Sequence, residues 1–316
     1  MQSRSSKVVI LGTGGTIAGT AAKPGDNVGY IAAQLGVAQL VDAVPGLADV
    51  PLETEQVAQV DSKDMTFEIW LALAQCVEHH LARADVVGVV VTHGTDTLEE
   101  TAYFLQRVLA PVKPVVLTAA MRPSSALLSD GPQNLLDAVT VAREAGACGV
   151  VAVLAGAVHS ALDVRKVHSY RVDAFSSGDA GIVGRVEEGR IRRFRDWPVG
   201  PGVGLARIPP DSASWPMVEI ITSHANAGGA LAQAAAAAGV RGLIVAGSGN
   251  GAVHHLLEAA LVALQRQGVL VWRSTRCLEG PVLPKPDDLL PSADTLTPVK
   301  ARIEMLLQLM ASPAAA

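Results

Sequence analysis

Two apolar runs, each followed by a turn rich in threonine and glycine, constrain the fold of this chain more than any other feature. They cover residues 8–11 (Val-Val-Ile-Leu) and 86–91 (Val-Val-Gly-Val-Val-Val). Continuous runs of this kind are typical of parallel strands that are buried on both faces. Ligands of parallel sheets bind beyond the carboxyl ends of the strands, which is where these turns begin. We therefore expect an α/β fold with a ligand site at the turns.

Both turns carry hydroxyl side chains. The first supplies Thr13 and Thr16, and the second, 92–97 (Thr-His-Gly-Thr-Asp-Thr), supplies Thr95 and Thr97. Glycine and small hydroxyl residues expose backbone N–H groups and let a substrate approach closely, which suits acyl transfer with a threonine nucleophile. A dinucleotide-binding loop is not expected, because the glycines of the first turn are not spaced as G-x-G-x-x-G and no acidic residue closes a second strand.

Composition excludes several classes of function. The net charge is −5, and basic residues are scattered except at residues 190–195, which we interpret as a solvated strand edge. This charge pattern predicts neither nucleic-acid nor membrane binding. Residues 1–7 lack the hydrophobic stretch of a signal peptide, and no apolar run is long enough to span a bilayer, so we expect a cytoplasmic protein.

Cysteine and histidine usage gives no sign of a metal site. Cys76, Cys148 and Cys277 are far apart and lie in apolar segments, as expected of reduced, buried thiols. The eight histidines show no metal-ligand spacing. We therefore predict no metal.

Strand and helix signals alternate twice along the chain, as in parallel sheets flanked by helices. The expected strands are 8–11, 55–60, 86–91, 115–117, 150–154, 217–221, 243–246 and 269–272. The expected helices are 31–44, one capped by Asp64, 98–109, 134–144, one ending at Ala238, 252–267 and one capped by Thr297. Proline and glycine crowd residues 198–216, which predicts a linker.

The predicted organisation is a larger N-terminal catalytic domain (1–197) with a parallel sheet and flanking helices, the linker 198–216, and a smaller C-terminal α/β domain (217–316). At 316 residues and 49% hydrophobic, the chain is long enough for both domains to have cores of their own.

Three further residues are candidates for chemistry. Asp96, with Glu99 three positions later, fits a capping box, but a carboxylate at a helix N-terminus can also hold a substrate ammonium. Lys166 follows the expected strand 150–154 and can serve as a general base only if its environment keeps it neutral. The glycine-rich segment 25–29 indicates a loop that carries Tyr30 over a site as a lid, or else a surface loop with an incidental tyrosine.

Taken together, these residues resemble the bacterial L-asparaginase/glutaminase family of amidohydrolases. The matching motifs are 10–19, 61–65, 92–102, 120–123, 130–132, 247–251 and 273–276. The resemblance implies hydrolysis of the side-chain amide of L-asparagine to aspartate and ammonia, through an acyl-enzyme and without a cofactor. L-Glutamine is implied as a second substrate.

The resemblance also implies a role for each site residue. Thr16 is the nucleophile, polarised by Tyr30, while Thr95, Asp96 and Lys166 handle the proton and the attacking water. Which threonine attacks first stays open. The implied substrate-binding residues are Ser62 (α-carboxylate), Lys63, Asp96 (α-ammonium), the carbonyl of Ala120 (amide nitrogen), backbone N–H groups near Thr95 (oxyanion) and Asn250.

The family builds its active sites from neighbouring subunits, so we expect a homodimer or homotetramer with shared sites. Two departures weaken this expectation. Ala252 stands where the family has a polar residue, and the loop that carries a glutamate in the family is shorter here, which leaves Glu279, Asp287 and Asp288 as candidates. No cysteine pair matches the disulfide of secreted members.

Two other functions compete with this interpretation. One is the ammonia-releasing subunit of a transfer-RNA-dependent amidotransferase, which usually has an additional N-terminal domain and an obligate partner. The other is a non-catalytic amino-acid sensor, which should have lost a threonine or the lysine, whereas Thr16, Thr95 and Lys166 are all present here. The pattern does not decide between asparagine and glutamine.

Overall fold

The structure is a computed structural model that describes residues 6–23 and 25–311. Its contacts divide the chain into two units, and the division falls between Leu205 and Ala206. Residues 1–5 of the predicted N-terminal domain and residues 312–316 of the predicted C-terminal domain lie outside the described residues. The boundaries expected around the linker 198–216 stay a prediction.

The N-terminal unit contains a sheet of eight strands in the order β12-β11-β8-β7-β6-β5-β1-β4. Their bounds are β1 Lys7–Gly14, β4 Leu52–Val60, β5 Val86–Thr92, β6 Val115–Thr118, β7 Val150–Leu154, β8 Ala157–Ser160, β11 Gly184–Glu187 and β12 Arg190–Arg193. The five strands from β4 to β7 are parallel, and the other three are antiparallel to their neighbours. The basic cluster forms the edge strand β12, as expected, and the α/β fold class is confirmed.

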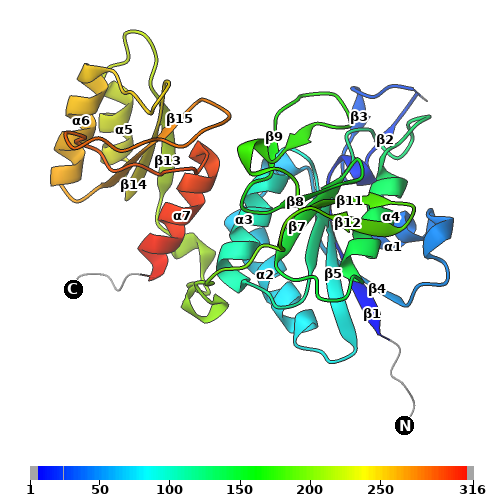
Figure 1. The fold of residues 1–316 in the computed structure, drawn as a ribbon. Helices are drawn as coiled ribbons and strands as arrows, with labels where there is room; N and C mark the ends of the chain where they lie inside the picture. The colour runs from blue at the N-terminus through cyan, green and yellow to red at the C-terminus, as the bar shows by residue number, and fades with distance from the viewer. Residues whose placement is uncertain (1–5, 24, 312–316) are drawn as a thin grey trace. The chain divides into compact units, whose positions relative to one another are not determined.

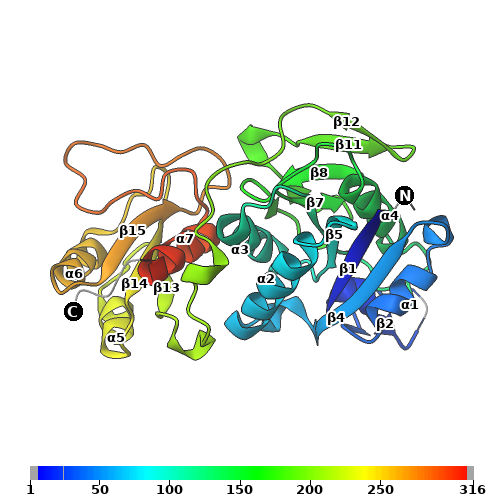
Figure 2. The same ribbon diagram turned by 90° about the horizontal axis from the view of Figure 1, so that it is seen from below.

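Four helices cover the two faces of this sheet (Figure 2). They are α1 (Val37–Asp42) and α4 (Gly131–Ala142) on one face, and α2 (Phe67–Leu81) and α3 (Leu98–Leu109) on the other. Val8 and Ile10 belong to the core cluster beneath α1 and α4, while Val9 and Leu11 point to the opposite face and are equally buried. Because side chains of a strand alternate between faces, burial on both faces explains the unbroken apolar run.

The helix expected over 31–44 is wrong for its first half, because only α1 is helical there. Ala33 N–H donates to the Gly15 carbonyl at 3.0 Å, and the N–H groups of Gln34 and Leu35 donate to the Ala18 carbonyl. These bonds hold the segment against the first threonine turn, so its backbone donors are not available for a helix.

The cap expected for α2 is also wrong. Thr66 is the N-cap, and its hydroxyl accepts a hydrogen bond from Ile69 N–H at 3.3 Å. Asp64 instead lies in the short 3-10 helix Ser62–Asp64. The predicted apolar face is present, with Trp70 and Leu73 buried.

Two short hairpins lie beyond the end of the sheet where its parallel strands finish (Figure 1). One pairs β2 (Thr20–Ala21) with β3 (Tyr30–Ile31), and the other pairs β9 (Arg165–Lys166) with β10 (Phe175–Ser176). Each hairpin therefore brings one predicted catalytic residue, Tyr30 or Lys166, to that end of the sheet.

The C-terminal unit is a smaller α/β structure with a parallel sheet in the order β13-β14-β15. Its elements are β13 Val218–Thr222, α5 Ala230–Ala237, β14 Gly242–Gly247, α6 His255–Arg266, β15 Leu270–Thr275 and α7 Pro298–Ala311. Helices α5 and α6 contact one face of the sheet, and α7 packs on the other. As predicted, Thr297 caps α7, since its hydroxyl accepts from Lys300 N–H at 3.5 Å.

Helix α6 begins later than expected. The predicted start at Ala252 is wrong, because Ser248 and Ala252 exchange backbone hydrogen bonds of 3.0 and 2.8 Å across a tight turn. His254 is the N-cap, and its ring accepts from Leu256 N–H at 3.3 Å. This turn is the one that carries Asn250.

The cysteines are all free, but the expectation of three buried thiols is wrong for Cys277, which is exposed. Cys277 follows β15 in a segment whose residues from Arg276 to Pro281 are all exposed. Cys76 and Cys148 are half-buried.

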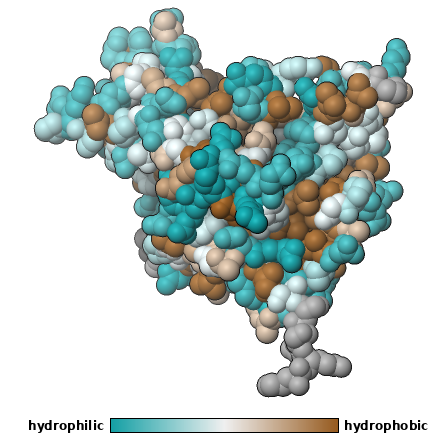
Figure 3. All heavy atoms as spheres, turned by 45° about the vertical axis from the view of Figure 1, so that its right-hand side comes forward, coloured by the Kyte–Doolittle hydropathy of each residue, from teal (hydrophilic) through white to brown (hydrophobic). Residues whose placement is uncertain are grey.

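The surface of the protein mixes both kinds of residue. Figure 3 shows hydrophobic residues gathered in separate groups between hydrophilic ones on the face in view. Isolated apolar side chains at a surface are normal in globular proteins. Across residues 6–23 and 25–311, every helix falls short of the length and apolarity that crossing a membrane requires.

Candidate active site

The two threonine turns lie side by side because β1 and β5 are neighbours in the sheet, with Gly12 opposite Thr92. The Thr13 hydroxyl donates to the Thr92 carbonyl at 2.9 Å. At the tip, the backbones of Gly15 and Gly94 are in contact, and a Cβ at Gly15 would overlap the backbone of Gly94. Only glycine permits this approach, and the positive φ of 81° at Gly15 also favours it.

Thr16 and Tyr30 are brought together at the first turn. Thr16 opens a short 3-10 helix, is 7% exposed, and has its hydroxyl oxygen 2.7 Å from the phenol oxygen of Tyr30. Tyr30 reaches this position from β3, which pairs with β2 directly after the turn. A phenol at this distance can polarise the threonine hydroxyl.

Lys166 joins the second turn from a distant part of the chain. Its ammonium group donates to the Thr95 hydroxyl at 2.9 Å and to the Asp96 carboxylate at 2.6 Å. Thr95 is 5% exposed, and the Lys166 side chain is 18% exposed. A lysine bonded to both a buried hydroxyl and a carboxylate can pass a proton between them.

The capping role expected for Asp96 is wrong. Helix α3 has Thr97 as its N-cap, without a side-chain capping bond. The Asp96 carboxylate binds Lys166 instead, and the Glu99 carboxylate accepts a hydrogen bond from the Lys166 backbone N–H at 3.2 Å. Both acidic groups of the apparent capping box therefore form hydrogen bonds with Lys166.

Ser62 lies against the second turn. Its side chain is buried, and its hydroxyl accepts from Asp96 N–H at 3.2 Å, while its carbonyl accepts from the Thr97 hydroxyl at 2.7 Å. Lys63 is not brought into this cluster, because its exposed ammonium binds Asp61 and Asp64.

Ala120 follows β6 and is fully buried. The chain after it is fixed by Asp130, whose carboxylate accepts from the backbone N–H groups of Met121 and Arg122 at 2.9 Å each. The next residues support the β2–β3 hairpin, because the hydroxyl of Ser124 donates to the Gly19 carbonyl at 2.7 Å and that of Ser125 accepts from Ala21 N–H at 2.8 Å.

The supporting serines and Glu99 were not among the residues predicted for the site. Ser124 contacts a residue 105 positions away, and no local pattern signals such a contact. The spacing of Asp96 and Glu99 was the available signal for Glu99, but it indicated a helix cap instead.

Asn250 lies in the C-terminal unit, whereas the other predicted site residues lie in the N-terminal unit. Its side-chain amide forms two hydrogen bonds with the backbone of Leu283, donating to the carbonyl at 2.9 Å and accepting from the N–H at 2.7 Å. Of the three acidic candidates nearby, Asp288 is bound by the buried Arg273, whereas Glu279 and Asp287 are exposed. Asp288 is therefore paired with an arginine of its own chain.

A chain of buried hydrogen bonds connects helices α2 and α3 to the second turn. The indole of Trp70 donates to the Thr101 hydroxyl at 2.9 Å, which lies 2.9 Å from Nε2 of His93, and Nδ1 of His93 lies 2.7 Å from the Gly94 carbonyl. A carbonyl only accepts, so Nδ1 carries the proton and Nε2 accepts from Thr101. Burial lowers the pKa of His93 to about 4.

This neutral histidine makes the stability of the protein depend on pH. The unfolded chain binds a proton at His93 below its ordinary pKa of 6.5, but the folded chain does so only near 4. His93 therefore does not reduce the free energy of unfolding above pH 6.5. As the pH falls from 6.5 to 4, the free energy of unfolding decreases by about 3 kcal/mol. The free energy of unfolding of His93→Gln, measured with urea, should therefore depend less on pH over this range than that of the wild type. The same slope in both proteins would contradict the assignment.

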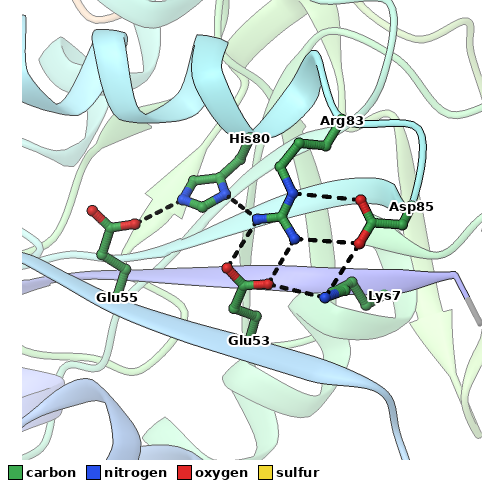
Figure 4. A network of polar contacts seen from close by, with 6 residues as sticks. All are labelled: Lys7, Glu53, Glu55, His80, Arg83 and Asp85. Carbon is green, nitrogen blue, oxygen red and sulfur yellow. Dashed lines mark hydrogen bonds and ion pairs between the residues drawn. The ribbon is translucent and has the colours of Figure 1, made fainter.

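A second polar cluster lies at the other end of the sheet, around the first residues of β1 and β5 (Figure 4). The Arg83 guanidinium donates to Glu53 at 2.9 and 2.8 Å and also binds Asp85, while Lys7 bridges the two carboxylates. The hydrogen bonds from Arg83 are the largest cause that lowers the pKa of Glu53 and of Asp85 to about 2. This cluster ties the end of α2 to three strands and lies away from the threonines.

Part of the second cluster has ligand types that suit a metal, which histidine spacing did not signal. Glu55, Cys76 and His80 have ligand atoms within 4.8 Å of one another, the one such group among the residues described. However, Arg83 donates to Nδ1 of His80 at 2.9 Å, so Nε2 carries the proton and donates to Glu55 at 2.7 Å. A metal at Nε2 would force a proton onto Nδ1 against Arg83, and we propose no metal there.

Comparisons with known proteins agree with this geometry. Residues 7–198 match the family model "Asparaginase, N-terminal", and residues 217–314 match "Glutaminase/Asparaginase C-terminal domain". L-asparaginase 2 of Bacillus subtilis is 40% identical over 95% of this chain and 81% of that protein. A glutaminase-asparaginase of Pseudomonas fluorescens is 37% identical over 98% of this chain and 87% of its own length.

A solved structure gives the same result. The crystal structure of a probable cytoplasmic L-asparaginase from Campylobacter jejuni superposes with a TM-score of 0.92 and is 38% identical, covering 98% of this chain and 96% of that one. The fold, both sequence matches and the full-length relatives lead to one conclusion. This chain is an enzyme of the asparaginase family of hydrolases.

Proposed function

We propose that this enzyme hydrolyses the side-chain amide of L-asparagine to L-aspartate and ammonia through a threonine acyl-enzyme, with L-glutamine as a slower substrate. The observation that carries the proposal is the pair of buried threonines in adjoining turns, each with its own proton-handling partner. The names of the relatives support the same substrates, since they include both L-asparaginase and glutaminase-asparaginase.

In the proposed reaction, the Thr16 oxygen attacks the amide carbon and its proton passes to the leaving nitrogen, with the Tyr30 phenol hydrogen-bonded to the reacting hydroxyl. The C–N bond breaks and ammonia leaves, which produces an ester on Thr16. Thr95 and Lys166 then activate a water that hydrolyses the ester, and the proton returns to Thr16. An initial attack by Thr95 is the other order of the same chemistry.

The proposed substrate contacts follow from the positions of the polar groups. Asp96 binds the α-ammonium and Ser62 the α-carboxylate, since Ser62 lies against the second turn next to Asp96. The Ala120 carbonyl receives the amide N–H, and backbone N–H groups near Thr95 receive the oxyanion. Lys63 has no part in these contacts, because Asp61 and Asp64 neutralise its ammonium, and Asn250 acts from another subunit.

Ammonia release by the purified enzyme tests the proposal. L-Asparagine should be the best of four substrates, L-asparagine, L-glutamine and their D-forms, and aspartate should form in equal amount with ammonia. Ammonia from L-glutamine alone would overturn the substrate assignment, and no release from any of the four would overturn the activity.

We also propose that the active form is a homodimer or homotetramer in which the Asn250 turn of one subunit completes the site of another. The exposure of Asn250 and the firm hold of its turn on Leu283 support this. Light scattering and activity measured along a dilution series should show activity falling as subunits dissociate. A fully active monomer would contradict a shared site.

A cytoplasmic location is part of the same proposal. Its support is the likeness to the probable cytoplasmic enzyme of Campylobacter jejuni.

A further inference from the structure

The strand that delivers Lys166 is short. Strand β9 has only two residues and pairs only with β10. A cavity of about 400 Å³ adjoins the hairpin, with Val167 and Phe175 among its lining residues, so packing does not fix the hairpin on that side. The position of the lysine must therefore depend on specific tethers.

Two such tethers come from the start of helix α3, one from Asp96, just before the N-cap Thr97, and one from Glu99 in the first turn. The Asp96 carboxylate holds the ammonium group of Lys166 at 2.6 Å, and the Glu99 carboxylate accepts from its backbone N–H at 3.2 Å. Val167 N–H, the next donor along the chain, turns the opposite way and donates to the Ala174 carbonyl of the hairpin at 2.8 Å. Neighbouring N–H groups of an extended chain point to opposite sides, so the Lys166 donor faces away from the hairpin, towards Glu99.

Helix α3 is itself a firm support. Leu98, Ala102 and Leu105 are fully buried, so the helix packs tightly onto the sheet. Glu99 thus connects a well-packed helix to a strand of only two residues.

We propose that Glu99 is a positioning residue for Lys166, which it holds through a backbone hydrogen bond without contacting the substrate. This inference rests on the proposed function, in which Lys166 moves a proton. A displacement of about 1 Å in a reacting group can cost about 10²-fold in rate. Loss of the Glu99 contact should therefore lower kcat by roughly 10-fold to 100-fold and leave KM within about threefold.

Two substitutions separate the reach of the side chain from its charge. Glu99→Gln keeps an oxygen at the same reach and loses the charge, so its kcat should stay within about threefold of the wild type. Glu99→Asp keeps the charge but is shorter by one methylene, so it should show the loss. Glu78→Gln, on the exposed side of α2, is the matched control and should leave both constants unchanged. If Asp retains kcat and Gln loses it, Glu99 acts through its charge and the proposal is wrong.

A double-mutant cycle shows whether Glu99 acts through the lysine. Adding Glu99→Asp to Lys166→Met should cost no further activity, because the group being positioned is already absent. If the two losses multiply, Glu99 acts independently and the inference fails. Failure of the proposed function looks different, because then the wild type releases no ammonia, or Lys166→Met retains full activity, whatever Glu99 does.

Discussion

Thr16→Ala is expected to lower kcat for asparagine by at least about 10³-fold, and Thr95→Ala by a similar factor, because nucleophile systems lose most of their rate when one member is removed. Each change removes a hydroxyl that bonds to a proposed catalytic partner, Tyr30 or Lys166. The fold should persist, since the surrounding backbone contacts do not involve these hydroxyls.

Steady-state ammonia release and thermal unfolding check both variants. Thr54→Ala is the control. Thr54 is exposed on β4, so its substitution should leave the rate and the stability unchanged. Near-normal turnover in Thr16→Ala or Thr95→Ala would remove that threonine from the mechanism. Mass spectrometry of a Thr95→Ala sample quenched during turnover should detect the ester on Thr16, which decides the order of attack.

Lys166→Met is expected to lower kcat by about 10²-fold to 10⁴-fold, the usual loss for a general base, with a smaller change in KM. The ammonium bonds to Thr95 and Asp96, so its removal affects proton transfer more than substrate binding. Lys166→Arg separates two roles, because a guanidinium keeps the charge but cannot release its proton in proteins. An active arginine variant would show that only the charge matters, and a loss confined to KM would make Lys166 a binding residue.

Much of the sheet could be predicted because its strands are buried on both faces. That environment permits only apolar residues, so β5 and β7 stand out as unbroken runs. Helix α3 begins and ends at the predicted residues, since its apolar face repeats regularly and Ala110 ends it in the left-handed conformation.

The errors arose where contacts from elsewhere in the chain override local preference. The segment 31–36 has helix-forming residues, but its N–H groups are used by the carbonyls of the first turn. Asp64 and Asp96 are both of a residue type that commonly caps helices. However, Asp64 binds Lys63, and Asp96 binds Lys166, which lies 70 positions away. Pattern alone gave no reason to join Lys166 to Thr95, and only the resemblance to a family did so.

The contact between Gly15 and Gly94 has a consequence for how this enzyme can diversify. Backbone meets backbone there, so the separation of the two threonine turns is set by van der Waals radii and cannot be tuned by substitution. A larger residue at Gly15 would overlap the Gly94 backbone, and one at Gly94 would first meet the Ser62 side chain. Selection for a new amide substrate must therefore keep this spacing and act on other residues around the proposed site, such as the β2–β3 hairpin or the chain after Ala120.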